Sequence, residues 1–407
     1  LSIANEIGRA PTGKLRLTPN GKMYGILSQG GANSKGSIFE YDPTANSIVK
    51  KADFAGTDGT SPVELTQGTD GKLYGTTSSG GLNNDGVIFE FNPSTGGITK
   101  RFDFISVSSG AQPKGLMSAS NGKLYGMTFT GGASGVGTIF EFDPATSQFA
   151  KKYDFISVIG DNQGRPYGRL TEAPNGKLYG ADTGSGSGTL FEFDIANNTF
   201  TKKVIFSDAI GNPMFGSLYL SNNKMYGLTS RGGSANAGVL FEYDFATNDY
   251  VKKHDFAYAP DGVKPQGSLT MASNGKLYGV TRQGGATNDG VIFEIDPATD
   301  TYTKRADFTN ATTGSDPQAT LHLGLNGKLY GAARRGTPGS SGGLFEFDPA
   351  TNTLQNLSLF GITNGLTMIG KLTQTEDGKL WGLTSAGGTS FPNSGGVLFE
   401  FDPVSKT

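Results

Sequence analysis

The stretch Asn20-Gly21-Lys22-Met23-Tyr24-Gly25 decides the fold of this chain of 407 residues, because near-copies of it recur along the whole sequence. Repetition at a period near fifty residues is typical of architectures in which one small unit is stacked or arranged in a ring. The later copies begin, at spacings of 47 to 54 residues, at Asp70, Asn121, Asn175, Asn222, Asn274, Asn326 and Asp377. Eight such units account for nearly the whole chain.

Each unit contains four short phrases that indicate β-strands. The Asn-Gly stretch is followed by a phrase such as Gly86-Val87-Ile88-Phe89-Glu90-Phe91 and then by one such as Lys304-Arg305-Ala306-Asp307-Phe308. It is preceded by a phrase such as Lys264-Pro265-Gln266-Gly267-Ser268-Leu269. β-branched and aromatic residues bounded by Gly, Pro, Asn or Asp are typical of strands between turns, and no segment carries the apolar period of a helix. The pattern predicts an all-β, eight-bladed β-propeller with four antiparallel strands per blade, as one domain over residues 1–407.

Two turns are predicted within each unit. The Asn/Asp-Gly pair matches the two-residue hairpin loop in which both central residues have positive φ. The phrase Asp143-Pro144-Ala145-Thr146 and its equivalents match a turn in which the aspartate accepts hydrogen bonds from the backbone that follows it.

The two ends of the sequence are predicted to meet. The eighth unit ends at Asp402-Pro403, before any fourth strand, and Leu1-Ser2-Ile3-Ala4-Asn5-Glu6-Ile7 has no other place in the pattern. We expect this N-terminal segment to complete the last blade, because closure removes the exposed sheet edges of an open ring.

The composition excludes several functions. There is no cysteine, which excludes disulfides, thiolate metal sites and cysteine nucleophiles. A formal net charge of −2 gives no overall attraction to nucleic acid or to an anionic membrane. No apolar run reaches the length of a membrane span, so we expect no membrane insertion. The first residues, Leu1 to Arg9, lack the pattern of a signal peptide and are interpreted as a mature terminus or a trimmed edge.

A known repeat family has the same pattern. The run Tyr74-Gly75-Thr76-Thr77-Ser78-Ser79-Gly80-Gly81, followed by Gly86 to Pro93, resembles the kelch repeat, and more closely the GloVer-type tandem repeats of exported bacterial proteins. The resemblance implies a propeller that is secreted or displayed on a bacterial surface. Kelch-like oxidases use copper with a Cys–Tyr crosslink, and a chain with no cysteine and only His254 and His322 does not carry that activity. The kelch tryptophan is replaced here by Ile48, Ile98, Phe149, Phe200, Tyr250, Tyr302 and Leu354.

Residues present in every unit are interpreted as scaffold, since eight copies of one catalytic residue have no use. Tyr24 and its equivalents, with Trp381 in the eighth unit, are predicted core aromatics, and Phe39 and its equivalents are expected to fill the space between blades. The glutamate that follows, Glu40 in the first unit and Glu400 in the last, is expected on an exposed face, paired with the lysines of the outer strand. Segments such as Asn84-Asp85-Gly86 lack the alternating acids of a calcium loop, so no metal or other cofactor is expected.

Irregular positions are the better place to search for a site. In this topology the loops between the second and third strands share a face with the connections between blades, and on that face an arc of basic residues covers units four to seven. Arginine binds carboxylate, sulfate or phosphate groups through its planar fork, and Tyr167, Phe215 and Tyr219 are suited to stacking. The predicted ligand-binding residues are Arg165, Tyr167, Arg169, Arg231, Arg282, Arg334 and Arg335, with Lys264 nearby. The alternative is a solvated rim whose arginines pair locally, for example with Asp182, Asp208 or Asp316.

Catalysis by acid and base would need a histidine or carboxylate outside the repeat pattern. His322 is the one candidate catalytic residue, because it lies on an inner strand where most other units have Thr. Tyr219 is its candidate partner, Glu64 and Glu172 are the irregular inner-strand carboxylates, and His254 is expected on the surface. No serine elbow, phosphate loop or zinc motif is present.

Three functions stay open on the sequence. The first is a non-catalytic, secreted or cell-surface binding module, monomeric unless it is part of a larger assembly, that recognises a glycan or surface polymer through the loop face. The second is a protein-interaction platform in a surface or secretion assembly. The third is a polysaccharide lyase or hydrolase that uses His322.

Overall fold

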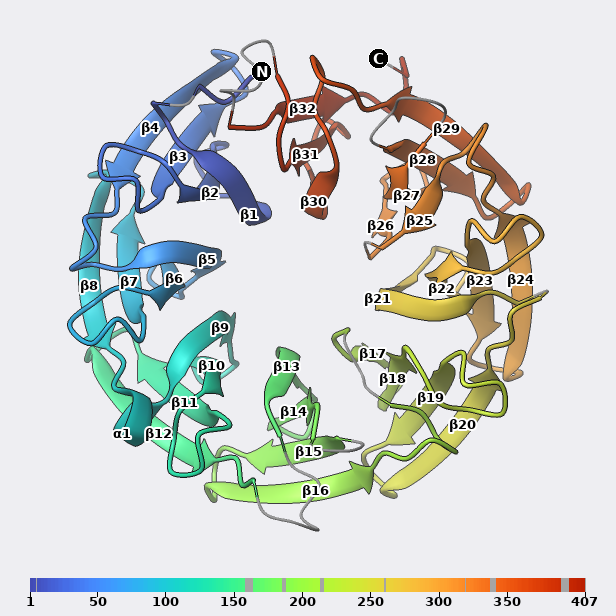
Figure 1. The fold of residues 1–407 in the computed structure, drawn as a ribbon, viewed down its shortest axis with the longest axis horizontal. Helices are drawn as coiled ribbons and strands as arrows, with labels where there is room; N and C mark the ends of the chain where they lie inside the picture. The colour runs from blue at the N-terminus through green and yellow to red at the C-terminus, as the bar shows by residue number, and fades with distance from the viewer. Residues whose placement is uncertain are drawn as a thin grey trace.

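Eight small antiparallel sheets surround a common centre in the computed structural model, and the fold is an eight-bladed β-propeller (Figure 1). The structure describes residues 1–4, 6–157, 164–184, 188–212, 216–259, 261–318, 320–336, 342–388 and 395–406, with the backbone alone at residue 369. Within each blade the strands follow the chain from the centre outward, so every blade begins on an inner strand. The predicted fold class is confirmed.

The first four blades consist of sixteen strands. These are β1 (Arg9–Leu17), β2 (Met23–Gln29), β3 (Ser37–Asp42), β4 (Ser47–Asp53); β5 (Thr60–Gln67), β6 (Leu73–Ser79), β7 (Val87–Asn92), β8 (Gly97–Asp103); β9 (Ala111–Ser118), β10 (Leu124–Thr130), β11 (Thr138–Asp143), β12 (Gln148–Asp154); β13 (Pro166–Glu172), β14 (Lys177–Asp182), β15 (Thr189–Asp194) and β16 (Thr199–Ile205). A single short helical turn, α1 (Ser106–Ser109), connects the second and third blades in the described part of the chain.

The last four blades are built in the same way, with a divided inner strand in the seventh. Their strands are β17 (Tyr219–Ser221), β18 (Lys224–Thr229), β19 (Val239–Asp244), β20 (Asp249–Asp255); β21 (Val263–Met271), β22 (Leu277–Gln283), β23 (Val291–Asp296), β24 (Thr301–Asp307); β25 (Ser315–Pro317), β26 (His322–Leu323), β27 (Leu329–Arg335), β28 (Gly343–Asp348), β29 (Thr353–Leu359); β30 (Met368–Gln374), β31 (Leu380–Thr384) and β32 (Leu398–Phe401).

The N-terminus closes the ring, as predicted, and it lies beside the last blade (Figure 1). Ser2 pairs antiparallel with Val397, and the Ile3 amide donates to the Gly396 carbonyl at 2.9 Å. The side chain of Ile3 is fully buried in a core that joins the last blade to the first and includes Trp381. Among the described residues of the predicted segment, residues 1–3 pair with the last blade as its fourth strand.

The core lies between blades. The described residues form eight apolar clusters, and each cluster joins neighbouring blades. In one of them Tyr24, Ile26 and Phe54 of the first blade pack on Leu73 and Phe89 of the second. The glycine that follows each repeated tyrosine is required by this packing, because a methyl group on Gly75 would clash with the ring of Phe89. The structure confirms the predicted structural role of the repeated tyrosines and phenylalanines.

The Asn/Asp-Gly turn differs from the prediction. In seven blades only the glycine has positive φ, for example 77° at Gly21, and the Thr18 amide donates to the Lys22 carbonyl across a three-residue loop. This is a type I turn with a glycine bulge. The two-residue loop is found in the fifth blade alone, where Asn222 and Asn223 both have positive φ and Ser221 pairs with Lys224. The aspartate turn is as predicted, because Asp143 accepts from the Ala145 amide at 2.9 Å.

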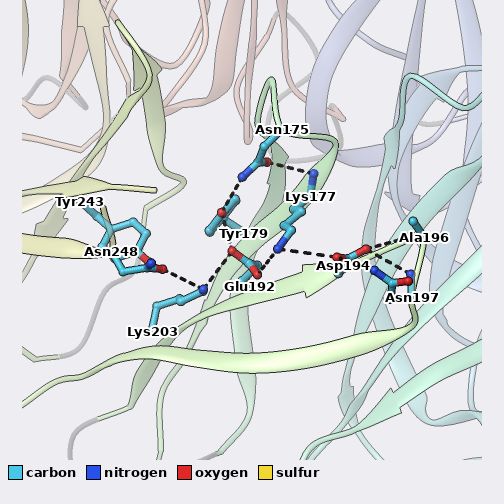
Figure 2. A network of polar contacts seen from close by, with 10 residues as sticks. All are labelled: Asn175, Lys177, Tyr179, Glu192, Asp194, Ala196, Asn197, Lys203, Tyr243 and Asn248. Atoms are coloured by element: carbon cyan, nitrogen blue, oxygen red, sulfur yellow. Dashed lines mark hydrogen bonds and ion pairs between the residues drawn. The ribbon is translucent and has the colours of Figure 1, made fainter. Parts of the chain in front are cut away.

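The prediction that the repeated glutamates are exposed is right for Glu400 and wrong for the other seven. Seven of them, Glu40, Glu90, Glu141, Glu192, Glu242, Glu294 and Glu346, are at most 7 % exposed. In the fourth blade Glu192 accepts from the Tyr179 hydroxyl at 2.6 Å and pairs with Lys177 at 2.8 Å, while Lys203 of the outer strand approaches to 3.1 Å (Figure 2). The predicted pairing with the outer strand is therefore present, but it is a buried network that joins three strands.

This network predicts an acid-dependent loss of stability. Burial opposes the ionisation of Glu294, yet hydrogen bonds from Arg305, Lys276 and Tyr278 outweigh it and lower the pKa of the carboxyl to about 2. In the unfolded chain a glutamate has a pKa of about 4.3. The stabilisation is therefore complete above that value and is lost as the pH falls toward 2. Glu294→Gln should lower the free energy of unfolding by about 1 to 3 kcal/mol at pH 7 and flatten its dependence on pH between 5 and 2, measured by urea unfolding. An unchanged pH dependence would contradict this account.

Candidate binding site in the central channel

Bulges in the inner strands direct side chains into the channel. On β1, Thr12 faces Ile26 and Arg16 faces Tyr24, so three residues lie opposite the single Gly25 on β2. The same irregularity is found in the fourth, sixth and eighth blades. Each bulge begins with a glycine of positive φ, for example 67° at Gly13, a conformation that glycine adopts without steric cost. A bulge of this kind turns the next side chain away from the sheet.

The side chains after these glycines form one level of the channel wall. Lys14, Arg169 and Lys371 are basic, and the equivalent residues in blades five, six and seven are Ser217, Ser268 and Thr320. All six line a cavity of about 440 Å³. We call the face that carries the Gly-Gly loops the loop face. The inner strands begin at this face, since Arg9 at the start of β1 pairs with Gln29, the last residue of β2 before its Gly-Gly loop. The cavity lies toward the loop face. The opposite face, which carries the Asn-Gly turns, is the turn face.

One carboxylate lies among these cations. Glu64 of β5 lines the same cavity, and it forms ion pairs with Arg169 and, at 3.7 Å, with Arg16. Its side chain is 16 % exposed, so solvent screens these pairs less than surface ones. Among the residues that the structure describes, neither Lys14 nor Lys371 has a carboxylate within ion-pair distance. The described lining therefore carries an excess of positive charge.

The pKa values reflect this crowding. Burial lowers the pKa of Lys14 to about 8, and the charges of Arg16, Lys371 and Arg169 act in the same direction. Burial and Arg16 lower the pKa of Arg169 to about 10, and burial and Arg169 lower that of Lys371. The folded protein thus holds mutually repelling cations close together, and a bound anion would relieve this repulsion.

The channel toward the turn face is held together by side-chain hydrogen bonds. Thr66, Thr270 and Thr373 each donate a hydroxyl hydrogen bond to a carbonyl of the next blade's inner strand, at 2.6 to 2.9 Å. The Arg16 guanidinium donates to the Leu65 carbonyl at 2.5 Å in the same way. These residues connect neighbouring blades around the channel, and Arg16, Thr270 and Thr373 line a cavity of about 560 Å³ there.

His322 and Tyr219 both line that cavity. The neighbour of the His322 ring is the amide of Gln374, with 3.4 Å between the His322 Nε2 and the Gln374 Oε1. Burial, together with the charge of Lys14, lowers the pKa of His322. In the described part of the channel no carboxylate orients this histidine, so its catalytic role stays a prediction.

Two other irregular residues lie away from the channel cations. Glu172 accepts a hydrogen bond from the Ser120 amide at 2.8 Å. His254 is half-buried and stacks on Tyr302 with 3.6 Å between ring centroids, so the prediction that it lies on the surface is wrong. Its position in the second and third blades is taken by Phe102 and Tyr153, which stack in the same way.

The predicted basic arc divides into separate groups. Arg169 lines the channel, and Tyr167, 41 % exposed, lines the same cavity. Arg165 lies on the ring of Phe129, 5.0 Å from its centroid, and Lys114 lies 4.4 Å from the same centroid. Cation–π contacts of this kind hold basic groups beside the mouth without neutralising them.

The remaining arginines of the arc lie farther out. Arg282 forms a two-point ion pair with Asp316, at 2.7 and 3.2 Å, as the alternative of local pairing predicted. Arg334 is half-exposed and approaches Asp316 to 3.8 Å beside a cavity of about 420 Å³ that Lys371 also lines. Arg231 and Arg335 are exposed, and Lys264 contacts Gln283. Phe215 lies outside the described residues.

The sequence analysis did not identify Lys14, Arg16, Lys114 and Lys371 as site residues. Lys14 and Lys371 occupy the position of Arg169, directly after the glycine of the inner-strand phrase. The signal was an alignment of that one position across the blades, where blades one, four and eight have a basic residue and blades five to seven have Ser or Thr.

Neither a metal site nor a membrane span is found in the part of the chain that the structure describes. No group of three or more His, Asp or Glu side chains gathers there as metal ligands, and no described helix has the length and apolar character needed to cross a membrane.

Solved structures with the same kind of fold are distant in sequence. The puromycin-hydrolysing peptidase of Mycobacterium tuberculosis is 7 % identical with a TM-score of 0.52, and the alignment covers 93 % of this chain and 59 % of that one. A puromycin hydrolase mutant complexed with PGG is 11 % identical with a TM-score of 0.52, covering 94 % and 59 %. The extracellular domain of BT4673 from B. thetaiotaomicron is 14 % identical with a TM-score of 0.40, covering 97 % and 53 %. This chain spans little more than half the length of these proteins.

Sequence comparison is more specific. No curated protein matches the sequence. The Gloeobacter/Verrucomicrobia repeat matches four overlapping segments, residues 1–186, 103–272, 157–312 and 260–407, which together span the sequence. The repeated unit described above is therefore the unit of a known family, and this chain belongs to the Gloeobacter/Verrucomicrobia repeat family.

Proposed function

We propose that this propeller is a non-catalytic binding module that takes an acidic glycan or surface polymer at the loop-face mouth of its channel. The observation that carries the proposal is the pair Lys14 and Lys371, which face a cavity of about 440 Å³ with no carboxylate partner among the described residues. Export to the bacterial surface is part of the proposal and rests on the resemblance to exported repeat proteins.

The arrangement suits an anionic group better than a neutral one. The cations stand on bulged strands whose positions are fixed by the hydrogen bonds between blades, so the protein is pre-organised for the charge that it receives. The basic surface continues from the channel to the loop face through Lys114 and Arg165, with Tyr167 beside them. A second cavity is lined by both Arg334 and Lys371, so Arg334 is also near the channel lysines. A carboxylate would then enter the channel while the rest of the polymer crosses the loop face.

A binding screen on acidic and neutral glycans tests this proposal. Acidic glycans should bind and neutral glycans of the same length should not, with affinity that falls as salt increases. Arg334→Glu with Arg335→Glu should weaken binding by about tenfold, because reversing charges at a rim slows encounter with an anion. The matched control is Lys100→Glu with Lys151→Glu, which makes the same charge change on the outer strands β8 and β12. Equal binding of neutral and acidic glycans would refute the proposal. If the arginine variant binds acidic glycans as tightly as the native protein, Arg334 and Arg335 are not part of the binding surface.

A further inference from the structure

Glu64 occupies an unusual place in the repeat. It stands on β5 at the position where blades one, three, four, five, six and eight have the glycines Gly13, Gly115, Gly168, Gly216, Gly267 and Gly370. The second blade has no residue equivalent to Lys14, because β5 is shorter at this point. The second blade therefore has an anion on a nearly regular strand where six other blades have a glycine, and it lacks the residue that is basic on the bulges of blades one, four and eight.

The neighbouring glycines leave room for this carboxylate. A methyl group on Gly13 would lie 3.1 Å from Glu64 Cγ, and one on Gly115 would lie 3.7 Å from its Oε2 and 3.8 Å from Arg169 Nη2. The side chain thus passes between two glycine positions to reach Arg16 and Arg169, which belong to blades one and four. Glu64 thus connects the inner strands of blades one, two and four, and its charge acts on any anion that enters the cavity.

The charges divide into two parts. Arg16 and Arg169 share Glu64, whereas Lys14 and Lys371 have no acidic partner in the described structure. A ligand anion beside the lysines is attracted by them and repelled by Glu64. Because Coulomb energy is proportional to the charge of the ligand, Glu64 repels a doubly charged group twice as strongly as a singly charged one at the same place.

We infer that Glu64 is a built-in counter-ion that sets the charge selectivity of the channel, shifting it from doubly charged phosphate monoesters toward singly charged carboxylates such as those of uronic acids. The inference rests on the proposed function, since it assumes that an anion occupies the space between Lys14 and Lys371. It adds the class of acidic group and the residue that selects it.

The test compares two sugars that differ mainly in charge. D-Glucuronate carries one negative charge, and glucose 6-phosphate carries nearly two at neutral pH. Their affinities for the full chain are measured by titration calorimetry at one low ionic strength, with glucose as the neutral control. Glu64→Gln should strengthen glucuronate binding by about threefold and glucose 6-phosphate binding by about the square of that factor, ninefold.

Two further variants keep the result interpretable. Glu64→Gly places at this position the residue that six other blades carry, so it tests the same charge change if the glutamine variant folds poorly. Glu172→Gln is the matched control, an inner-strand carboxylate that hydrogen-bonds to Ser120 and should leave both affinities unchanged. Far-ultraviolet circular dichroism and thermal unfolding check that each variant is folded.

The outcomes separate the inference from the proposed function. Equal strengthening of both ligands, no strengthening, or the same effect from Glu172→Gln would overturn the inference, even if glucuronate binding depends on the two lysines. If neither sugar acid binds to the native protein or to the Glu64 variants, both the inference and the proposed function fail.

Discussion

Replacing Lys14 and Lys371 together by glutamine should weaken the binding of acidic glycans by at least about a hundredfold. A hydrogen bond to a charged group contributes about 1.5 to 3 kcal/mol, and each 1.4 kcal/mol changes affinity about tenfold. Both side chains line the loop-side cavity and lack an acidic partner in the described structure, so their charge is available to a ligand. Titration calorimetry with an acidic oligosaccharide measures the change.

The same variant should fold as well as the native protein or better. Burial and neighbouring cations lower the pKa of Lys14 to about 8, which means that its charged form is less stable in the folded channel than in the unfolded chain. This destabilisation is present below pH 8 and disappears as the pH rises toward the unfolded pKa of about 10.4. Removing the charges should raise the free energy of unfolding at pH 7 by about 1 kcal/mol, a value reduced for the solvent that reaches the channel.

The combination of weaker binding and higher stability distinguishes a binding role from a structural one. A structural lysine would lower stability when it is replaced, and the loss of binding would follow from misfolding. Lys100→Gln with Lys151→Gln is the matched control, because these lysines pair with Asp103 and Asp154 on the outer strands and should not affect binding. If the variant with Lys14 and Lys371 replaced binds acidic glycans with unchanged affinity, the ligand does not bind beside these two lysines.

The second large effect is expected at the closure of the ring, where Ile3→Asp should destabilise the propeller by about 4 kcal/mol or more. Truncating a buried isoleucine costs about 2 to 5 kcal/mol, and an unpaired charge in the same place adds a desolvation penalty. Ile3 is fully buried between the first and last blades, and its strand makes backbone hydrogen bonds of 2.7 to 2.9 Å to residues 395–398. The midpoint of urea unfolding should fall.

A surface position near the other end of the chain provides the control for this prediction. Val404 is 89 % exposed, so Val404→Asp introduces the same charge without disturbing a core. We expect its unfolding midpoint to match that of the native protein. If Ile3→Asp and Val404→Asp unfold at the same urea concentration, the N-terminal segment does not contribute to closing the ring.

The fold was predictable because the sequence repeats the same strand and turn signals in eight units. The phrase around Tyr24, or a close variant of it, occurs in every blade, so one ambiguous strand signal becomes eight concordant ones. Helical repeats were excluded because no segment has an apolar period of 3.6 residues. Closure of the last blade by the segment Leu1 to Ile7 followed from counting strands, and the structure narrows the pairing to residues 1–3. Turn geometry was less predictable, because Asn20 followed by Gly21 suits both a two-residue loop and a type I turn with a glycine bulge.

The repeated glutamates show why burial was misjudged. A strand pattern assigns Glu192 to one side of a sheet, but it does not reveal that Tyr179 and Lys177 provide partners on that same side (Figure 2). Charged residues are rarely buried unless they are paired, and the partners of Glu192 come from two strands, Tyr179 and Lys177 from β14 and Lys203 from β16.

The site was only partly predictable for a related reason. Arg169 was identified as part of the basic arc over units four to seven, whereas Lys14 and Lys371 lie in the first and last blades, outside those units. The register shift that aims them inward depends on how many residues lie opposite Gly25 and Gly382, which is a property of pairing between strands. Arg282 was included for its charge, and the structure favours the alternative of local pairing, because Arg282 forms an ion pair with Asp316.

A crystal structure of the protein with bound D-glucuronate tests the central claim most directly. The account predicts the carboxylate between the ammonium groups of Lys14 and Lys371, within hydrogen-bond distance of both, and the sugar ring directed toward Tyr167 and the loop face. A carboxylate bound on the outer strands, or at the turn face beside His322 without contact to either lysine, would contradict it.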